Sequence, residues 1–139
     1  MAAGGSNSIT VTIDTTGLAE GSYSAEIVIA SNDPDEASTT VPVTLQVSPA
    51  EPPTVTSVSP DSGEQGATLE VTIGGTNFTG ATAVSFGTGI TVNSFTVVSA
   101  TQITASISIS ATATLGLRDV SVTTPGGTGT LTDGFTVVV

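Results

Sequence analysis

A proline-rich segment at residues 48–53, with the sequence SPAEPP, limits the possible folds more than any other feature. Proline lacks a backbone N–H and has a fixed φ, so three prolines in six residues cannot continue a sheet interior or a helix. The segment therefore separates two parts of the chain. We predict a partial unit at residues 1–47, a linker at residues 48–53 and a complete domain at residues 54–139.

The part before the linker contains three runs in which apolar and polar residues alternate. This period of two is typical of half-buried strands. The apolar positions are Ile9, Val11 and Ile13 in the first run, Tyr23, Ala25, Ile27 and Ile29 in the second, and Val41, Val43, Leu45 and Val47 in the third. Three such strands form one sheet with an apolar face, which needs a second layer. About 45 residues without a disulfide or a metal rarely bury enough area to fold alone.

The missing layer predicts that this part of the chain associates with further strands. Strand addition supplies main-chain hydrogen bonds and pockets for alternate side chains. Two sources remain open at this point: another copy of the chain, which would assemble the protein in series, or upstream strands of a longer parent chain. The residues predicted to form the self-association surface are Ile9, Val11, Ile13, Ile27, Ile29, Val43 and Leu45.

The part after the linker has short strands at regular spacing with turn residues between them, which is the pattern of a β-sandwich. The predicted strands are residues 54–59, 68–74, 83–86, 90–98, 102–109, 116–124 and 134–139. The bulkiest core candidates are Phe78, Phe86, Phe95 and Phe135. The predicted fold is all-β: an immunoglobulin-like β-sandwich preceded by an incomplete half-sandwich of about three strands.

Two resemblances agree with this division. Residues 4–49 carry a Gly-x-Tyr strand entry, an SNDPD turn and a VPVTLQV strand, and they resemble the closing strands of immunoglobulin-like repeats in bacterial and archaeal surface proteins. Residues 54–139 carry Ser-Pro-x-Ser-Gly at 59–63, Gly-Thr-Asn-Phe at 75–78 and Thr-Pro-Gly-Gly at 124–127, and they resemble the IPT/TIG family. The second resemblance implies a complete immunoglobulin-like domain of the kind used as spacer, adhesion and carbohydrate-associated modules in microbes.

The charge balance excludes several partners. Twelve acidic residues oppose one basic residue, Arg118, and the formal net charge is −11. Such a field would not attract a nucleic acid backbone or an anionic membrane surface, and DNA-contacting members of the IPT/TIG family rely on basic loops that are absent here. No apolar run approaches the roughly 20 residues of a membrane span. A surface rich in Ser and Thr, acidic and free of Lys, indicates an extracellular or cell-surface protein.

One acidic turn is the best candidate for a metal site. Asn32, Asp33, Asp35 and Glu36 offer hard oxygen ligands that suit Ca²⁺. Their spacing does not match an EF-hand loop, so a solvated hairpin turn is the interpretation that we favour. We predict no other cofactor.

The remaining motifs predict no chemistry. Asn77-Phe78-Thr79 is a glycosylation sequon, but such short motifs arise often by chance. The glycines at 126, 127 and 129 are followed by no Lys, which favours a flexible hairpin over a phosphate loop. The alternation around Tyr23 places its ring toward the core.

The composition predicts no enzyme, because the chain has no Cys and no His, and its carboxylates are scattered over turns. We predict a non-catalytic extracellular structural or adhesive protein that self-associates by strand complementation. The alternative is a carbohydrate-associated accessory module, or a fragment of a large secreted multidomain surface protein or hydrolase, in contact with cell-surface polysaccharide. Absence of Trp and the single Tyr favour the structural role, since sugar binding uses aromatic platforms.

Overall fold

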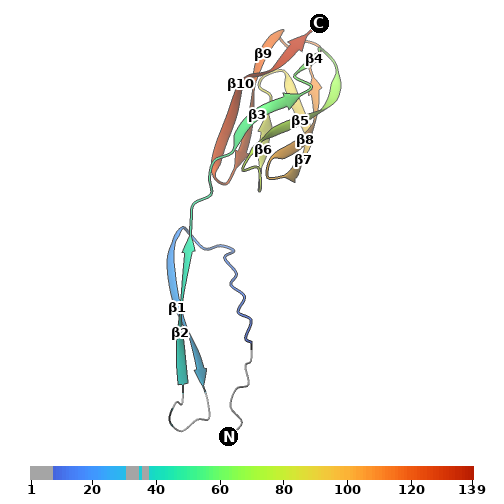
Figure 1. The fold of residues 1–139 in the computed structure, drawn as a ribbon. Coiled ribbons are helices and arrows are strands. Elements are labelled where there is room, and N and C mark those ends of the chain that lie inside the picture. Colours follow the sequence, from blue (N-terminus) through green and yellow to red (C-terminus); the bar gives the residue numbers. More distant parts are fainter. Residues whose placement is uncertain (1–7, 31–34, 36–37) are drawn as a thin grey trace. The chain divides into compact units, whose positions relative to one another are not determined.

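A computed structural model describes residues 8–30, 35 and 38–139 of the chain (Figure 1). The chain divides into two compact units, Met1–Pro49 and Ala50–Val139. All regular structure in the described residues is β-strand, so the prediction of an all-β fold is confirmed.

The first unit contains a two-stranded antiparallel sheet formed by β1 (Gly21–Ala30) and β2 (Ser38–Val47). Their register is regular and places Tyr23 opposite Leu45 and Ala25 opposite Val43. Because side chains alternate between the faces of a strand, these four residues share one face of the sheet. Only Asp35 is described in the connection between the two strands.

The sequence predicts a third strand at Ile9–Ile13, but the structure has no strand there. The segment runs alongside the hairpin in Figure 1 without a ladder partner among the described residues. Its Val11 and Ile13 side chains line a cavity together with the apolar face of β1 and β2. A segment that lies across a sheet face cannot pair with the edge of that sheet, because ladder hydrogen bonds lie in the sheet plane.

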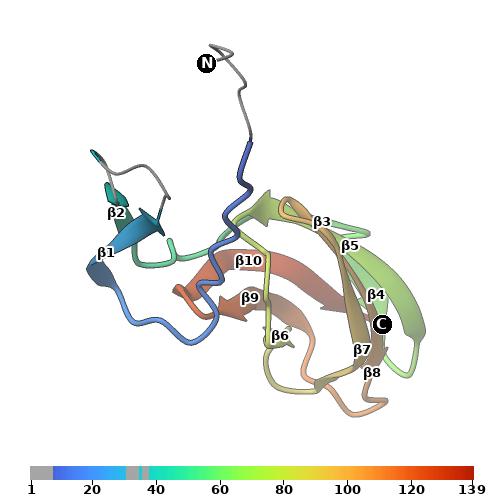
Figure 2. The same cartoon turned by 90° about the horizontal axis from the view of Figure 1, so that it is seen from below.

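The second unit is a sandwich of two four-stranded sheets, which Figure 2 shows face to face. One sheet has the order β4-β10-β9-β6 and the other β3-β5-β8-β7. The strands are β3 (Thr54–Ser59), β4 (Ser62–Glu64), β5 (Thr68–Thr76), β6 (Ala83–Ser85), β7 (Ile90–Ser99), β8 (Gln102–Ile109), β9 (Gly116–Thr124) and β10 (Gly127–Val138). All pairs are antiparallel except β4 with β10.

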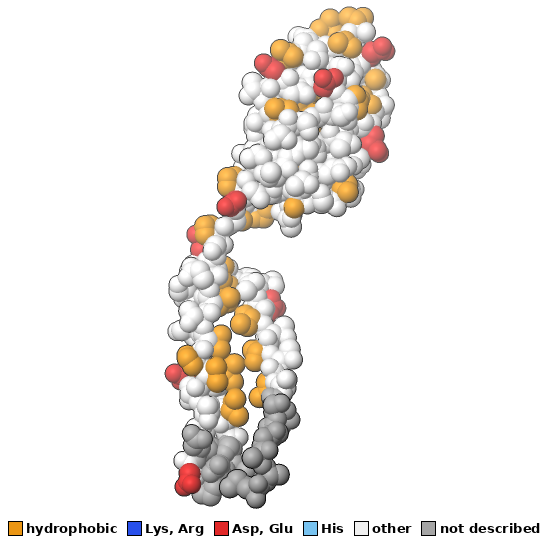
Figure 3. Space-filling model, in the orientation of Figure 1, with side chains coloured by type: hydrophobic (Ala, Val, Ile, Leu, Met, Phe, Trp, Pro, Cys, Tyr) orange, Lys and Arg blue, Asp and Glu red, His pale blue; other side chains and the backbone are white. Residues whose placement is uncertain are grey.

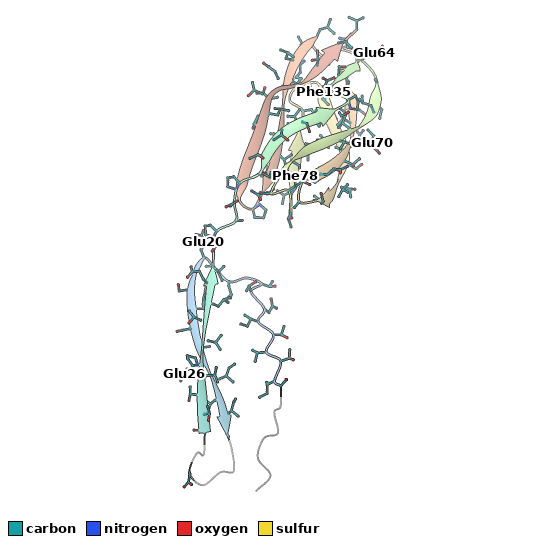
Figure 4. The ribbon with its side chains drawn as sticks, viewed as in Figure 1. Glu20, Glu26, Glu64, Glu70, Phe78 and Phe135 are labelled. Carbon is teal, nitrogen blue, oxygen red and sulfur yellow. The ribbon has the colours of Figure 1, made fainter. Side chains whose placement is uncertain are left out.

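The core of this sandwich lies between the two sheets. Phe78, Phe86 and Phe135 are completely buried, and Phe95 is half-buried against them. The rings of Phe86 and Phe135 meet edge to face, with centroids 5.4 Å apart and an interplanar angle of 88°, and Figure 4 shows Phe135 and Phe78 inside the domain. Three of the four predicted phenylalanines therefore form the centre of the core, and the fourth borders it.

All seven strands predicted for this unit are present, and two features differ. The sequence does not predict β4, because Ser62 and Gly63 belong to the Ser-Pro-x-Ser-Gly motif, which is typical of a turn. Pairing with β10 forms the strand, with Gly63 opposite Val137. The sequence also predicts a flexible hairpin around Gly127, whereas β10 begins at this residue and pairs with Thr124 of β9.

Residues 50–53 of the predicted linker pack on the second unit. Pro53 is buried, and the Asn77 Nδ2 group donates a hydrogen bond to the main-chain oxygen of Pro52 at 3.2 Å. The glycine at 129 leaves room for the backbone here, since a Cβ atom on it would lie 2.1 Å from the oxygen of Pro53. Within the described residues, no helix is long and apolar enough to cross a membrane.

Candidate functional site

The candidate site is an apolar cavity of about 190 Å³ in the first unit. It is lined by Val11, Ile13, Tyr23, Ser24, Ala25, Ile27, Val43 and Leu45. Figure 3 shows hydrophobic side chains on the facing sides of the N-terminal segment and the hairpin, with open space between them. We call this space the hairpin cavity.

One wall of the hairpin cavity is formed by Val11 and Ile13 of the N-terminal segment, and we call it the N-terminal wall. Its side chains are largely exposed to water. Val11 is 51% exposed and Ile13 is 49% exposed, and Ile9 in the same segment is 68% exposed. For comparison, core side chains such as Ile73 in the second unit are completely buried. Much of the apolar surface of this wall therefore remains in contact with water, which is unfavourable for β-branched side chains.

A tight turn ends this wall. The Thr16 N–H donates to Asp14 Oδ1 at 2.8 Å, and the Leu18 N–H donates to the Thr15 oxygen at 3.1 Å. Gly17 takes a φ of +78°, which glycine adopts without steric cost. Hydrogen bonds from the side chain and then the main chain of Thr16 lower the pKa of Asp14 from its ordinary value. An ionised Asp14 thus fixes the point at which the chain turns toward β1.

The opposite wall is the apolar face of β1 and β2. Tyr23 is half-buried, and its hydroxyl donates to the main-chain oxygen of Ala19 at 2.9 Å. The hydroxyl is therefore satisfied at the rim while the ring forms part of the wall. The prediction that Tyr23 faces inward is confirmed by its place in the lining.

The predicted self-association residues only partly coincide with the cavity. Val11, Ile13, Ile27, Val43 and Leu45 line it, whereas Ile9 and Ile29 do not. Ile29, which lies near the end of β1, is 39% exposed. The association of this surface with other strands stays a prediction. Sequence alternation identified the apolar face, and Ala25 of the lining shares the same alternation.

The chemistry of the hairpin cavity is that of a binding surface. Its lining contains no carboxylate, amine, imidazole or thiol. Glu26 of β1 is exposed and lies on the other face of the strand, as its place in the alternation requires (Figure 4). Such a cavity can gain free energy by burying apolar surface. Its lining has two hydroxyl groups, those of Ser24 and Tyr23, and the Tyr23 hydroxyl is bonded to the Ala19 oxygen.

The predicted calcium cluster lies mostly outside the described residues. Asn32, Asp33 and Glu36 belong to the part of the chain that the structure does not describe, and Asp35 is exposed. No group of three or more His, Cys, Asp or Glu residues that could hold a metal occurs among the described residues. Calcium binding at this turn stays a prediction.

A second hollow, of about 220 Å³, lies at the end of the sandwich in the second unit. It is lined by Ala50, Glu51, Asn77, Thr79, Ala100, Thr124, Pro125 and Gly126. Asn77 has a φ of +58°, and its Nδ2 group also approaches Glu51 Oε2 at 3.4 Å. The sequence shows Asn77 only as part of a sequon, because no local pattern reveals that residues 50–52 pack beside it.

Two comparisons with known proteins give matches. A model of the family described as quinohemoprotein amine dehydrogenase, alpha subunit domain III, matches residues 52–131. A similar solved structure is "SGBP-B from a complex xyloglucan utilization locus in Bacteroides uniformis", with 25% sequence identity and a TM-score of 0.42. The similarity covers 86% of this chain but only 30% of that one. No match is found among curated proteins.

The family match begins at Pro52, inside the segment that packs on the second unit, and it contains β3 to β9. The family's name mentions a haem, and haem iron takes its protein ligands from His, Cys, Met or Tyr. None of these residue types occurs in residues 52–131. The matched residues therefore do not fit an axially ligated haem, and no redox step can be assigned to them.

Proposed function

The chain belongs to the family of domain III of the quinohemoprotein amine dehydrogenase alpha subunit, and we propose that it is a non-catalytic structural or adhesive module of an extracellular protein. The family's description is that of one domain within a larger subunit, which suits a module that works beside other domains. In this proposal the second unit is a self-contained spacer. The first unit is completed by strands that it does not itself contain.

The hairpin cavity is the observation that carries this proposal. Its two walls are one sheet of two strands and a single segment without a ladder partner among the described residues. Apolar surface of this kind is normally covered in a working protein, and an exposed, contiguous patch marks an interaction site. A β-strand is a suitable cover, because both walls are extended in one direction and strand addition supplies alternating side chains.

The edges of the hairpin support strand addition. With only two strands in the sheet, β1 and β2 each have one edge without a neighbour among the described residues. Natural edges are often guarded by charged residues or proline. Glu26 in β1 and Pro42 in β2 lie opposite each other, and they are the charged residue and the proline that these two strands contain. The sequence of β2 contains no charged residue.

Family membership at a finer level is also part of the proposal: the second unit is of the IPT/TIG type. The quoted motifs have structural roles that support this. In Gly-Thr-Asn-Phe, a Cβ atom on Gly75 would lie 1.9 Å from the Thr54 oxygen, Asn77 has a positive φ, and Phe78 is completely buried. In Thr-Pro-Gly-Gly, the turn joins β9 to β10.

The experiment uses the full chain and two variants with equal charge. Val43→Asp places a carboxylate in the hairpin cavity, whereas Thr40→Asp places one on the other face of β2. We expect the wild-type protein either to associate or to bind the fluorophore ANS, which reports exposed apolar surface. Val43→Asp should reduce both effects, and Thr40→Asp should leave them unchanged. A wild-type monomer that binds no ANS would contradict the proposal.

A carbohydrate-associated accessory module is the second candidate function, including a place in a large secreted surface protein or hydrolase. The observation that favours it is the hollow beside Asn77, where Thr79 and Thr124 offer hydroxyl groups for sugar hydroxyls. No aromatic side chain lines this hollow to serve as a stacking platform. Saturable binding of a neutral polysaccharide that is lost in Thr79→Val would make this the better candidate.

A further inference from the structure

We propose that the first unit is completed by a second copy of the same chain, with the segment Ile9–Ile13 of each copy pairing antiparallel across a two-fold axis. The inference rests on the proposed function, because it names the chain that supplies the missing strand. It predicts a closed dimer, whereas the notion of assembly in series predicts an open chain of subunits.

The amino-acid sequence of the segment is palindromic. Residues 9–13 read Ile-Thr-Val-Thr-Ile in both directions. Antiparallel pairing centred on Val11 places Ile9 of one copy opposite Ile13 of the other, and Thr10 opposite Thr12. In a two-fold interface, each contact between two different positions occurs twice, once in each direction. A palindromic strand meets this requirement with matched side chains at every position.

The structure already gives this segment the correct orientation. Val11 and Ile13 face the hairpin cavity, and Thr10 and Thr12 are exposed. Paired segments would therefore present their isoleucines and valines to the hairpins and their threonines to water. The pairing would also cover Ile9, which is 68% exposed, with Ile13 of the other copy. Cross-strand pairs of Thr and of β-branched residues stabilise antiparallel sheets.

The backbone and the charges are compatible with the pairing. Residues 9–13 have no ladder partner among the described residues, so a second strand can meet their N–H and C=O groups. The segment itself is uncharged, and the turn at Asp14 ends it. In this register Asp14 lies opposite Ser8 of the other copy, so like charges are not directly opposed. Each chain carries a net charge of −11, so the two copies repel at long range, and salt should strengthen the dimer.

The test uses the fact that the chain has no cysteine. Residues directly opposite have Cβ atoms about 4.5–5.5 Å apart, whereas diagonal neighbours are about 7–8 Å apart, too far for a disulfide. We expect an oxidised mixture of Thr10→Cys and Thr12→Cys chains to form the mixed disulfide dimer. Each variant oxidised alone should remain at least several-fold less cross-linked. Efficient cross-linking of Thr10→Cys with itself would overturn the register centred on Val11, and efficient self-cross-linking of both variants would overturn the antiparallel arrangement in favour of parallel strands.

Light scattering of the full chain provides the second measurement. We expect a twofold rise in mass with protein concentration, promoted by salt, lost in Val11→Asp and kept in Thr40→Asp. A monomer under all conditions overturns the second-copy inference. If that monomer binds ANS and exchanges its β1 and β2 amides rapidly, the unit still lacks a strand and the proposed function stands. If it binds no ANS and exchanges those amides slowly, the proposed function fails as well.

Discussion

Gly126 lies against the main chain of Glu51, so closely that a Cβ atom on Gly126 would be 2.2 Å from the Glu51 oxygen. These residues are 75 positions apart in the sequence. Their contact fixes the proline-rich segment to the turn between β9 and β10, and the Asn77 Nδ2 group holds the neighbouring Pro52 oxygen. The boundary between the units therefore follows Pro49 and not Pro53.

Gly126→Ala should destabilise the second unit, because a backbone oxygen cannot move aside as the end of a flexible side chain can. Overpacking of this kind costs typically about 1–3 kcal/mol. The measurement is the urea unfolding free energy of the full chain. Thr130→Ala, an exposed substitution on β10, is the control and should change it little. Equal stability of Gly126→Ala and wild type would show that residues 50–52 are not firmly docked.

The second unit should fold alone when it begins at Ala50. Its core is continuous between its two sheets, and Pro53 in the docked segment is also buried. A chain of residues 50–139 is therefore expected to melt cooperatively and to give a β-type circular dichroism spectrum. A chain of residues 54–139 should melt at a lower temperature, because it lacks the docked segment. Identical melting of both chains would contradict the role of residues 50–53.

Arg118 is expected to stabilise two loops of the sandwich through its guanidinium group. Its Nε donates to the Thr88 oxygen at 3.0 Å, its Nη1 to the Leu117 oxygen at 2.8 Å, and its Nη2 to the Thr114 oxygen. Arg118→Met should cost at least about 1.5–3 kcal/mol, the usual value of one hydrogen bond to a charged group. Arg118→Lys keeps the charge but loses the planar set of donors, so it should be intermediate. Thermal melts at high salt would separate the loss of charge from the loss of these contacts.

Asp14 should titrate at a lower pH in the folded protein than in the unfolded chain. Because its folded pKa is lowered, the turn gains stability above the unfolded pKa, and this gain disappears as the pH falls through the folded pKa, below about pH 4. A ¹³C titration of the carboxyl group measures the value directly. Thr16→Ala should raise it toward the ordinary value, and Thr16→Ser, which keeps the hydroxyl, should not. An unchanged pKa in Thr16→Ala would exclude the Thr16 hydroxyl as the cause and leave the main-chain N–H.

Calcium should raise the melting temperature only modestly, and any specific part of the rise should depend on the turn at residues 32–36. A ligand that binds the folded state stabilises it according to its concentration and affinity. The variant with both Asp33→Asn and Asp35→Asn tests this turn, because it removes two of the candidate carboxylates. If the rise is the same in this variant, calcium acts by screening the net charge of −11.

The sequence by itself determined the elements that depend on local patterns. Alternation of apolar and polar residues and the turn residues between the runs are properties of neighbouring positions, so they identified β1, β2 and every strand of the sandwich except β4. The alternation also identified the apolar face with Ile27 and Val43, and the inward side of Tyr23. The prolines marked the region where the chain divides.

Only the tertiary structure decided where those elements meet. The alternation at Ile9–Ile13 is compatible with a strand that pairs at a sheet edge or with an extended segment that lies over a sheet face. The structure has the second arrangement. Neither the pairing of Gly63 with Val137 nor the contact of Gly126 with Glu51 leaves a local signal. Both contacts bring together residues that are more than 70 positions apart. They form because the whole domain packs in one arrangement, and no short stretch of sequence encodes that arrangement.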